Sequence, residues 1–314
     1  RIAYLMAERN VAPTEILAIT FTNKAANEMK ERVAHMVGPE ARSMWVSTFH
    51  SACVRILRNE AKRLNLKPSF TIYDTQDSVR MLSLVSKDLG IDPKSYSPKY
   101  LLGQISNLKN ELIDYEDAIS KAVTAQEQTV AQAYGEYQRR LMLASAVDFD
   151  DLIGHTVALL QAFPDVAEYY HRRFRHVLVD EYQDTNHAQY ILIRELVGTG
   201  KEGLPPAELC VVGDADQSIY AFRGANIRNI VEFERDYSDA QTVVLEQNYR
   251  STQNILTSAN SVIEKNSGRP AKRLWTAEGS GEKIVIYTAN DEHHEADFIV
   301  TNVADLIDNH GFDY

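Results

Sequence analysis

The sequence predicts an α/β fold in which a parallel sheet carries an inserted helical subdomain. Short runs rich in Ile, Val and Leu recur without polar alternation, which is typical of strands buried on both faces of a parallel sheet. Most of these runs precede segments with helical periodicity, and one long block between them has helical periodicity alone. The expected strands are residues 15–21, 44–50, 176–181, 208–214, 242–248 and 283–289.

The first two expected strands are each followed by an expected helix. Apolar residues recur at helical spacing in 24–37, after the first strand, and Thr22 or Asn23 can cap this helix. Residues 51–64 have the same pattern after the second strand. Repeated strand-then-helix units favour neighbouring parallel strands.

The block between the second and third strands has a different pattern. It contains no strand-like run, and three segments in it have the spacing of amphipathic helices: 76–90, 99–113 and 131–144. One more helix is expected at 254–266. We therefore expect a first α/β domain formed by 1–73 and 149–245, a helical subdomain at 74–148, and the beginning of a second α/β domain at 246–314.

Composition indicates a globular protein and gives one argument against nucleic acid. The 314 residues carry a formal net charge of -11, so any nucleic-acid binding must rest on a local groove. No run of 18 apolar residues is present, and the first residues lack the apolar core of a signal peptide, which favours a cytoplasmic protein. Cys53 and Cys210 lie in apolar segments, which indicates buried thiols in a reducing compartment.

Acidic residues follow two of the expected strands. Asp180 and Glu181 come directly after the apolar run 177–179, and Asp214 and Asp216 follow the next strand. Open α/β sheets bind ligands beyond the carboxyl ends of their strands. One carboxylate there can hold Mg²⁺ and a second can orient or deprotonate the attacking water of a phosphoryl transfer. The alternative is an acidic pair that simply ends a strand in solvent.

The loop after the strand at 208–214 combines polar and aromatic residues. Gln217 could hydrogen-bond a γ-phosphate, and Tyr220 and Phe222 could stack on bases, next to Arg223. This loop and the acidic pair are expected at the same edge of the sheet.

Two other segments resemble binding motifs only superficially. Residues 291–297 hold adjacent histidines, but adjacent helical residues point about 100° apart, so a polar helix start is favoured over a metal site. Residues 196–203, LVGTGKEG, would need Gly at 195 and Ser or Thr at 202 to form a phosphate loop, where Glu195 and Glu202 stand. We expect neither site to exist.

Six segments in order resemble a known motif series. ILAITFTNKAANEM, VSTFHS, DFDDLI, VLVDEYQDTN, VVGDADQSIYAFRGA and LEQNYRST are similar to motifs Ia, Ib, Id, II, III and IV of the superfamily 1 DNA helicases of the UvrD, PcrA and Rep type. The likeness covers nearly the whole chain and is nearer to PcrA and UvrD than to the helicase-nuclease branch. It implies a RecA-like parallel sheet of the P-loop NTPase type.

The resemblance also implies an activity and its ligands. The expected function is that of an ATP-dependent DNA helicase, which uses ATP and Mg²⁺ and moves 3′ to 5′ on single-stranded DNA and at single-strand/duplex junctions, in repair or replication. Asp180 would hold Mg²⁺ and Glu181 would be the catalytic base. Gln217 would sense the γ-phosphate, Arg250 would be an arginine finger, and Tyr249 would stack on adenine. The alternative for Arg250 is a surface salt bridge.

The family's groove for single-stranded DNA maps onto several aromatic and polar positions here. Stacking and short polar contacts do not require a basic chain. The alternative for Phe21 and Phe149 is core packing. The family usually has Trp at the position of Phe222 and Arg at that of Ala221, which puts the strength of stacking there in doubt. The matching residues are Phe21, Asn23, His50, Phe149, Tyr220, Phe222 and Arg223.

The resemblance predicts that motifs are missing at both ends. The family's phosphate loop would lie just before residue 1, and later motifs would follow residue 314, so we expect an internal piece of a helicase with little activity alone. Two rivals remain open: a helicase-nuclease subunit of the AddA or RecB kind, and a non-catalytic DNA-binding scaffold.

Overall fold

A computed structural model describes the chain except for residues 201–202, 220–224, 227, 232, 267–271 and 314. The chain divides into two compact units, Arg1–Ala240 and Gln241–Tyr314.

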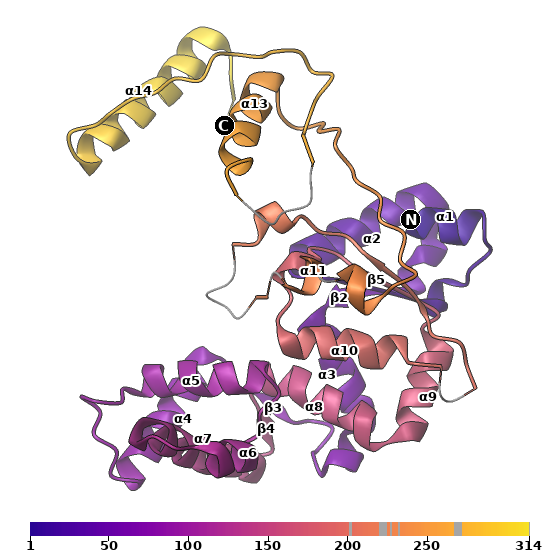
Figure 1. Ribbon diagram of the computed structural model, residues 1–314, viewed down its shortest axis with the longest axis vertical. Helices are drawn as coiled ribbons and strands as arrows, with labels where there is room; N and C mark the ends of the chain where they lie inside the picture. Colours follow the sequence, from indigo (N-terminus) through magenta and orange to yellow (C-terminus); the bar gives the residue numbers. More distant parts are fainter. Residues whose placement is uncertain (201–202, 220–224, 227, 232, 267–271, 314) are drawn as a thin grey trace. The chain divides into compact units, whose positions relative to one another are not determined.

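The first unit is built around a parallel sheet. In its described part, four strands lie in the order β2–β1–β5–β6, and every neighbouring pair is parallel (Figure 1). Ala18 of the central strand β1 is in register with Val46 on one side and Leu178 on the other. The carboxyl ends of all four strands therefore meet at one edge, and the predicted α/β class is confirmed. The strands are β1 (Ile16–Thr20), β2 (Trp45–Thr48), β5 (His176–Val179) and β6 (Glu208–Val211).

Helices cover both faces of this sheet. Alternate residues of β1 therefore pack into two different cores. Leu17 and Ile19 pack in a core with residues of α3, α8 and α10, whereas Ile16 and Ala18 pack in a core with residues of α1 and α2. Thr22 caps α2 by accepting a hydrogen bond from Ala25 N, which decides between the two cap candidates. The helices are α1 (Ile2–Ala7), α2 (Asn23–Val37), α3 (Phe49–Glu60), α8 (Phe149–Ala162), α9 (Pro164–Arg173), α10 (His187–Val197), α11 (Arg228–Val231) and α12 (Phe233–Asp236).

The block expected to be helical forms a cluster with its own core (Figure 1). Leu82, Leu101, Ile105 and Tyr137 are fully buried at its centre. The chain enters and leaves it through two short parallel strands, β3 (Thr71–Ile72) and β4 (Ala146–Val147). Neither these strands nor α6 was predicted. The helices are α4 (Thr75–Asp88), α5 (Pro98–Asn110), α6 (Tyr115–Lys121) and α7 (Ala125–Leu143).

The second unit contains helices α13 (Gln253–Ile263) and α14 (Glu292–His310). The strands predicted at 242–248 and 283–289 are wrong, since neither segment is a strand and only Gln247 forms an isolated bridge, with Trp275. A strand needs a partner for its backbone and an apolar surface on which to pack. Here only Gln247 has a bridge partner in the two segments, and Ile286 is 90% exposed, so neither requirement is met.

Two predictions from composition can be compared with the described structure. Cys53 and Cys210 are free thiols as expected, although Cys210 is only partly buried. Among the described residues, no helix combines the length and the apolar character that a membrane crossing requires.

Short 3₁₀ turns complete the described structure. They are η1 (Pro13–Glu15), η2 (Pro39–Ser43), η3 (Ala61–Leu64), η4 (Tyr182–Asp184) and η5 (Ala215–Gln217).

Candidate functional site

The acidic pair lies at the carboxyl edge of the sheet, where the chain leaves β5. Asp180 still belongs to the sheet, because its backbone N–H donates to Ile19 O at 2.9 Å. Glu181 then adopts a left-handed backbone conformation, with φ 52° and ψ 42°. A residue with a side chain is disfavoured there by about 1 to 2 kcal/mol, and such strain persists where the surroundings impose it, often at functional sites. This turn leaves Asp180 partly buried and Glu181 exposed.

Within the described part of the chain, no basic side chain pairs with Asp180 or Glu181. Burial raises the pKa of Asp180, and the neighbouring Glu181 raises it further. Burial and Glu181 also raise the pKa of Asp184, whose Oδ1 is buried without a hydrogen-bond partner in the described structure. Excess negative charge in a partly dry site is suited to a bound cation.

The donor set fits Mg²⁺ better than a metal held entirely by protein. The described residues contain no group of three or more His, Cys, Asp or Glu side chains that could hold a metal ion. Mg²⁺ commonly takes one or two carboxylates and completes its shell with water and substrate phosphates. Asp180 can supply such a carboxylate.

Gln183 holds the acidic pair against the next loop, a role that we did not predict. Its side chain is 1% exposed. Its Nε2 donates to Glu181 Oε2 at 2.8 Å, and its Oε1 accepts from Asp214 N at 3.0 Å. A Cβ at Gly213 would lie 2.6 Å from Gln183 Oε1, so the glycine permits this close approach. The only sequence signal was an amide two residues after Glu181.

Gln217 lies in the loop that Gln183 holds. It is exposed, and its Nε2 donates to Asp214 Oδ2 at 2.8 Å. A continuous set of hydrogen bonds thus runs from Glu181 through Gln183 and Asp214 to Gln217. The structure brings the two predicted loops together, as expected from the parallel sheet. Tyr220, Phe222 and Arg223 lie outside the described residues.

Of the other predicted DNA-binding residues, Phe21 and Asn23 follow β1, His50 follows β2, and Phe149 begins α8. The ring of Phe149 meets that of His50 edge to face at 5.6 Å and is 47% exposed, so core packing does not explain Phe149. Burial lowers the pKa of His50. Phe21 packs partly on the core, against Phe49 at 5.5 Å. Asn23 is exposed in the first turn of α2.

Tyr249 and Arg250 belong to the second unit. Tyr249 is 77% exposed, and its hydroxyl donates to Gln247 Oε1 at 3.0 Å. Arg250 N donates to Asn248 Oδ1 at 2.9 Å. The surface salt bridge considered for Arg250 does not form among the residues that the structure describes.

The described residues of the two superficial motifs have ordinary structural roles. Residues 196–197 end α10, and Gly198 follows with φ 78°, so the glycines terminate a helix instead of cradling a phosphate. His294 lies in the first turn of α14, with Nδ1 3.0 Å from Asp291. Residues 201–202 of the first motif lie outside the described residues.

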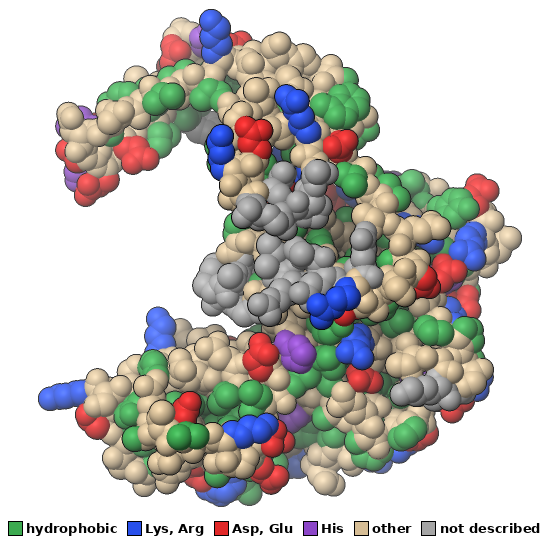
Figure 2. Space-filling model, viewed as in Figure 1, with side chains coloured by type: hydrophobic (Ala, Val, Ile, Leu, Met, Phe, Trp, Pro, Cys, Tyr) green, Lys and Arg blue, Asp and Glu red, His purple; other side chains and the backbone are tan. Residues whose placement is uncertain are grey.

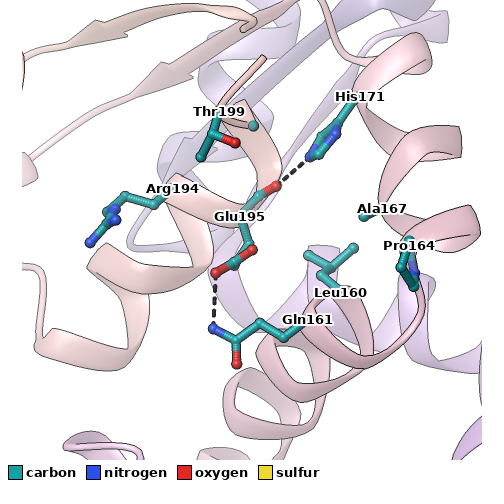
Figure 3. A pocket seen from close by; sticks show the side chains of 9 residues that line it. Leu160, Gln161, Pro164, Ala167, His171, Arg194, Glu195 and Thr199 are labelled. Atoms are coloured by element: carbon teal, nitrogen blue, oxygen red, sulfur yellow. Dashed lines mark hydrogen bonds between the residues drawn. The ribbon is translucent and has the colours of Figure 1, made fainter. Parts of the chain in front are cut away.

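A surface pocket of about 260 Å³ lies elsewhere, between α9 and the C-terminal ends of α8 and α10 (Figure 3). His171 Nε2 lies 2.6 Å from Glu195 O, and Gln161 Nε2 donates to Glu195 Oε1 at 2.9 Å. None of the predicted site residues lines it. The acidic edge, at the other end of α10, is therefore the better candidate site.

Charge is spread over the face of the molecule that Figure 2 shows. On the face shown in Figure 2, side chains of Lys and Arg are interspersed with those of Asp and Glu, and their described members form no continuous basic surface. This pattern agrees with the expectation that DNA binding must rest on local aromatic and polar contacts.

Comparison with known families defines the class of protein. Residues 1–238 match the UvrD/REP helicase N-terminal domain, and residues 243–314 match the UvrD-like helicase C-terminal domain. The chain therefore belongs to the UvrD/Rep helicase family.

Similar individual proteins are bacterial helicases. The chain is 64% identical over 308 residues to the ATP-dependent DNA helicase UvrD1 of Mycobacterium tuberculosis, covering 96% of this chain and 40% of that protein. Identity is 61% over 316 residues to UvrD1 of Mycobacterium leprae (98% and 41%) and 52% over 303 residues to the ATP-dependent DNA helicase PcrA of Staphylococcus aureus (96% and 41%). The chain thus spans about 40% of the length of these relatives, and the expected likeness to UvrD and PcrA is confirmed.

Proposed function

We propose that this chain is part of an ATP-dependent DNA helicase that moves 3′ to 5′ on single-stranded DNA in repair or replication. The hydrogen-bonded link from Glu181 to Gln217 supports this best. It joins an acidic pair suited to phosphoryl transfer to a loop suited to sensing phosphate. The names of the relatives, ATP-dependent DNA helicases, support the same activity.

The predicted site residues of both units have roles in ATP hydrolysis under this proposal. Asp180 would be the carboxylate ligand of a bound Mg²⁺, and this ion would neutralise charge on the nucleotide phosphates. Glu181 accepts a proton from the attacking water, for which its exposed position leaves room. Gln217 hydrogen-bonds the γ-phosphate. Arg250 neutralises charge that develops on the transferred group, and Tyr249 stacks on adenine.

Single-stranded DNA and single-strand/duplex junctions are the proposed partners. The exposed ring of Phe149, next to His50, offers a face on which a base can stack. Phe21 and Asn23 add contacts after β1. Tyr220, Phe222 and Arg223 are proposed to complete the groove from the loop after β6.

The domain division proposed for the helicase is the one predicted from the sequence. Residues 1–73 and 149–245 form the first motor domain, 74–148 form the inserted helical subdomain, and 246–314 begin the second motor domain. The separate core of the helical cluster and the division of the chain near residue 240 support it.

The catalytic proposal is tested by ATP hydrolysis in a protein of the relatives' length that carries this sequence. Glu181→Gln should lower the DNA-stimulated turnover by about 10² to 10⁴, the range of lost acid-base help, and leave ATP and DNA binding within a few-fold. Glu40→Gln, at an exposed position, is the control. Unchanged turnover of the Glu181 variant contradicts the base assignment, and a wild type without ATPase activity favours the scaffold instead.

The DNA proposal is tested by anisotropy of a labelled oligo-dT. Phe149→Ala should weaken binding by about 1 to 3 kcal/mol, the usual value of one stacked base. Tyr4→Ala removes an equally exposed ring from α1 and should leave affinity unchanged. Equal affinities of both variants and wild type would exclude Phe149 from the groove.

A further inference from the structure

Lys109, in the last turn of α5, is a buried cation that joins the helical cluster to α8. Its Nζ lies 2.7 Å from Asp148 Oδ2 and 2.7 Å from Asp151 Oδ1, and all three side chains are at most 6% exposed. Tyr137 OH and Gln138 Nε2, both on α7, donate to the same two carboxylates. Burial opposes the charged ammonium, but Asp151 and Asp148 raise the pKa of Lys109 above its ordinary value. The cation is therefore retained at neutral pH.

The same two carboxylates also form the cap of α8. Asp148 Oδ1 accepts from Asp151 N at 2.9 Å, and Asp151 Oδ2 accepts from Asp148 N at 3.1 Å. Each carboxylate thus uses one oxygen for the cap and the other for Lys109. Phe149 is the first residue of this turn and carries the ring that meets His50. Lys109 therefore fixes the turn that presents Phe149.

The next residue of α5, Asn110, contacts the loop that follows the acidic pair. Asn186 Nδ2 donates to Asn110 Oδ1 at 2.7 Å. The segment from Glu181 to Asn186 is a compact turn, in which Thr185 Oγ1 donates to Tyr182 O at 2.7 Å and both of those side chains are fully buried. Because this turn is short and packed, a displacement of Asn186 is transmitted to the acidic pair.

We propose that Lys109 and Asn110 couple DNA binding at Phe149 and His50 to the placement of Glu181. This rests on the proposed helicase function. Both are positioning residues, because Lys109 acts through Asp148 and Asp151 and Asn110 acts through Asn186. They are neighbours at the end of one helix, so a shift of the α8 turn on binding DNA moves the contact with Asn186 as well. The helical cluster thereby takes part in stimulating hydrolysis, beside the direct link through Gln183.

The test uses Asn110 in a protein of the relatives' length that carries this sequence, because a change there leaves the buried ion cluster intact. Asn110→Leu removes the acceptor for Asn186, whereas the matched control Asn110→Asp keeps an oxygen in the same place. For wild type and both variants, three quantities are measured: ATP hydrolysis without DNA, its maximal stimulation by oligo-dT, and oligo-dT affinity.

We expect Asn110→Leu to lower the stimulation by DNA without lowering the basal rate or the oligo-dT affinity. Asn110→Leu should lower the maximal stimulation about tenfold, within the usual range of coupling between two sites. Its basal rate and oligo-dT affinity should stay within about twofold, and Asn110→Asp should match wild type. Stimulation of Asn110→Leu equal to that of wild type overturns the coupling alone, as does a parallel loss of all three quantities. A wild type that DNA does not stimulate overturns the proposed function and the coupling with it.

Discussion

The first unit holds two pairs of carboxylates that the fold treats in opposite ways. Asp148 and Asp151 are buried and share the cation of Lys109. Asp180 and Glu181 lie at the sheet edge, and no basic side chain in the described part of the chain pairs with them. The first pair needs nothing from outside the protein, whereas the second leaves its charge for a ligand. A protein cation beside a carboxylate thus indicates a structural role, whereas a carboxylate without one is available to bind a ligand.

The largest expected effect comes from removing the internal cation. Lys109→Met leaves two carboxylates buried without it, which should lower the free energy of unfolding by about 3 to 5 kcal/mol in urea titrations. Lys121→Met breaks an exposed pair with Asp117 and should change it by less than about 0.5 kcal/mol. Similar small losses in both variants would remove the distinction between the two pairs of carboxylates.

The edge pair is held by Gln183, and Gly213 lies so close to Gln183 that one added methyl group should disturb it. The Cβ of Gly213→Ala would lie 2.6 Å from Gln183 Oε1 and 3.1 Å from Tyr182 N, so a loss of about 1 to 3 kcal/mol in unfolding free energy and a lower ATPase rate are expected. Gly154→Ala, in α8 with nothing within 4 Å, should instead stabilise by up to about 1 kcal/mol. An unaffected Gly213 variant would show that Gln183 can move freely.

Asp150 lies between the members of the buried pair and has no cation of its own in the described structure. Burial, and next the charge of Asp148, raise its pKa to about 6, against a hydrogen bond with Ser106. A raised carboxyl pKa stabilises the fold below the ordinary value, and this contribution is lost as the pH rises through about 6. Asp150→Asn should therefore match wild type near pH 4 and exceed it by about 1 to 3 kcal/mol near pH 8. A difference that does not vary with pH in urea titrations contradicts the assignment.

The smallest expected effect concerns Asp180. The pKa of Asp180 is raised, as is that of Asp150, so its effect on stability changes with pH in the same direction. Asp180→Asn should therefore be more stable than wild type by up to about 1 kcal/mol near pH 8 without Mg²⁺. Adding Mg²⁺ and nucleotide should reduce or reverse that advantage, because only the wild type gains the ion. Melting temperatures with and without Mg²⁺ and nucleotide measure this directly. An advantage that Mg²⁺ and nucleotide leave unchanged would argue against Asp180 as a ligand.

The sequence predicted the sheet well because its signals are local. Runs such as 16–20 and 176–179 are continuous and rich in β-branched residues, and the acids that follow them mark the edge. The placement of Gln217 beside the acidic pair followed from parallel topology alone. Segments 242–248 and 283–289, wrongly predicted as strands, have the same local pattern. They lack a neighbouring strand to pair with, and a local pattern carries no information about pairing.

Long-range polar contacts were not predictable in the same way. Lys109 lies in an amphipathic helix, where a lysine usually faces solvent, and its partners are 39 and 42 residues away. In the sequence, nothing distinguishes Gln183 from other polar residues. Its role follows only from the hydrogen bond that it accepts from Asp214 N. Such contacts depend on how elements meet, and periodicity carries no information about that.

The short pairing of β3 with β4 places the two ends of the helical cluster side by side, with Thr71 opposite Ala146 and Ile72 opposite Val147. Joining two neighbouring ends costs little loop entropy, so this cluster is suited to exchange as a module during evolution or in engineered chimeras. Any replacement must bring a cation of its own to Asp148 and Asp151, and this requirement limits which modules the rest of the first unit can accept.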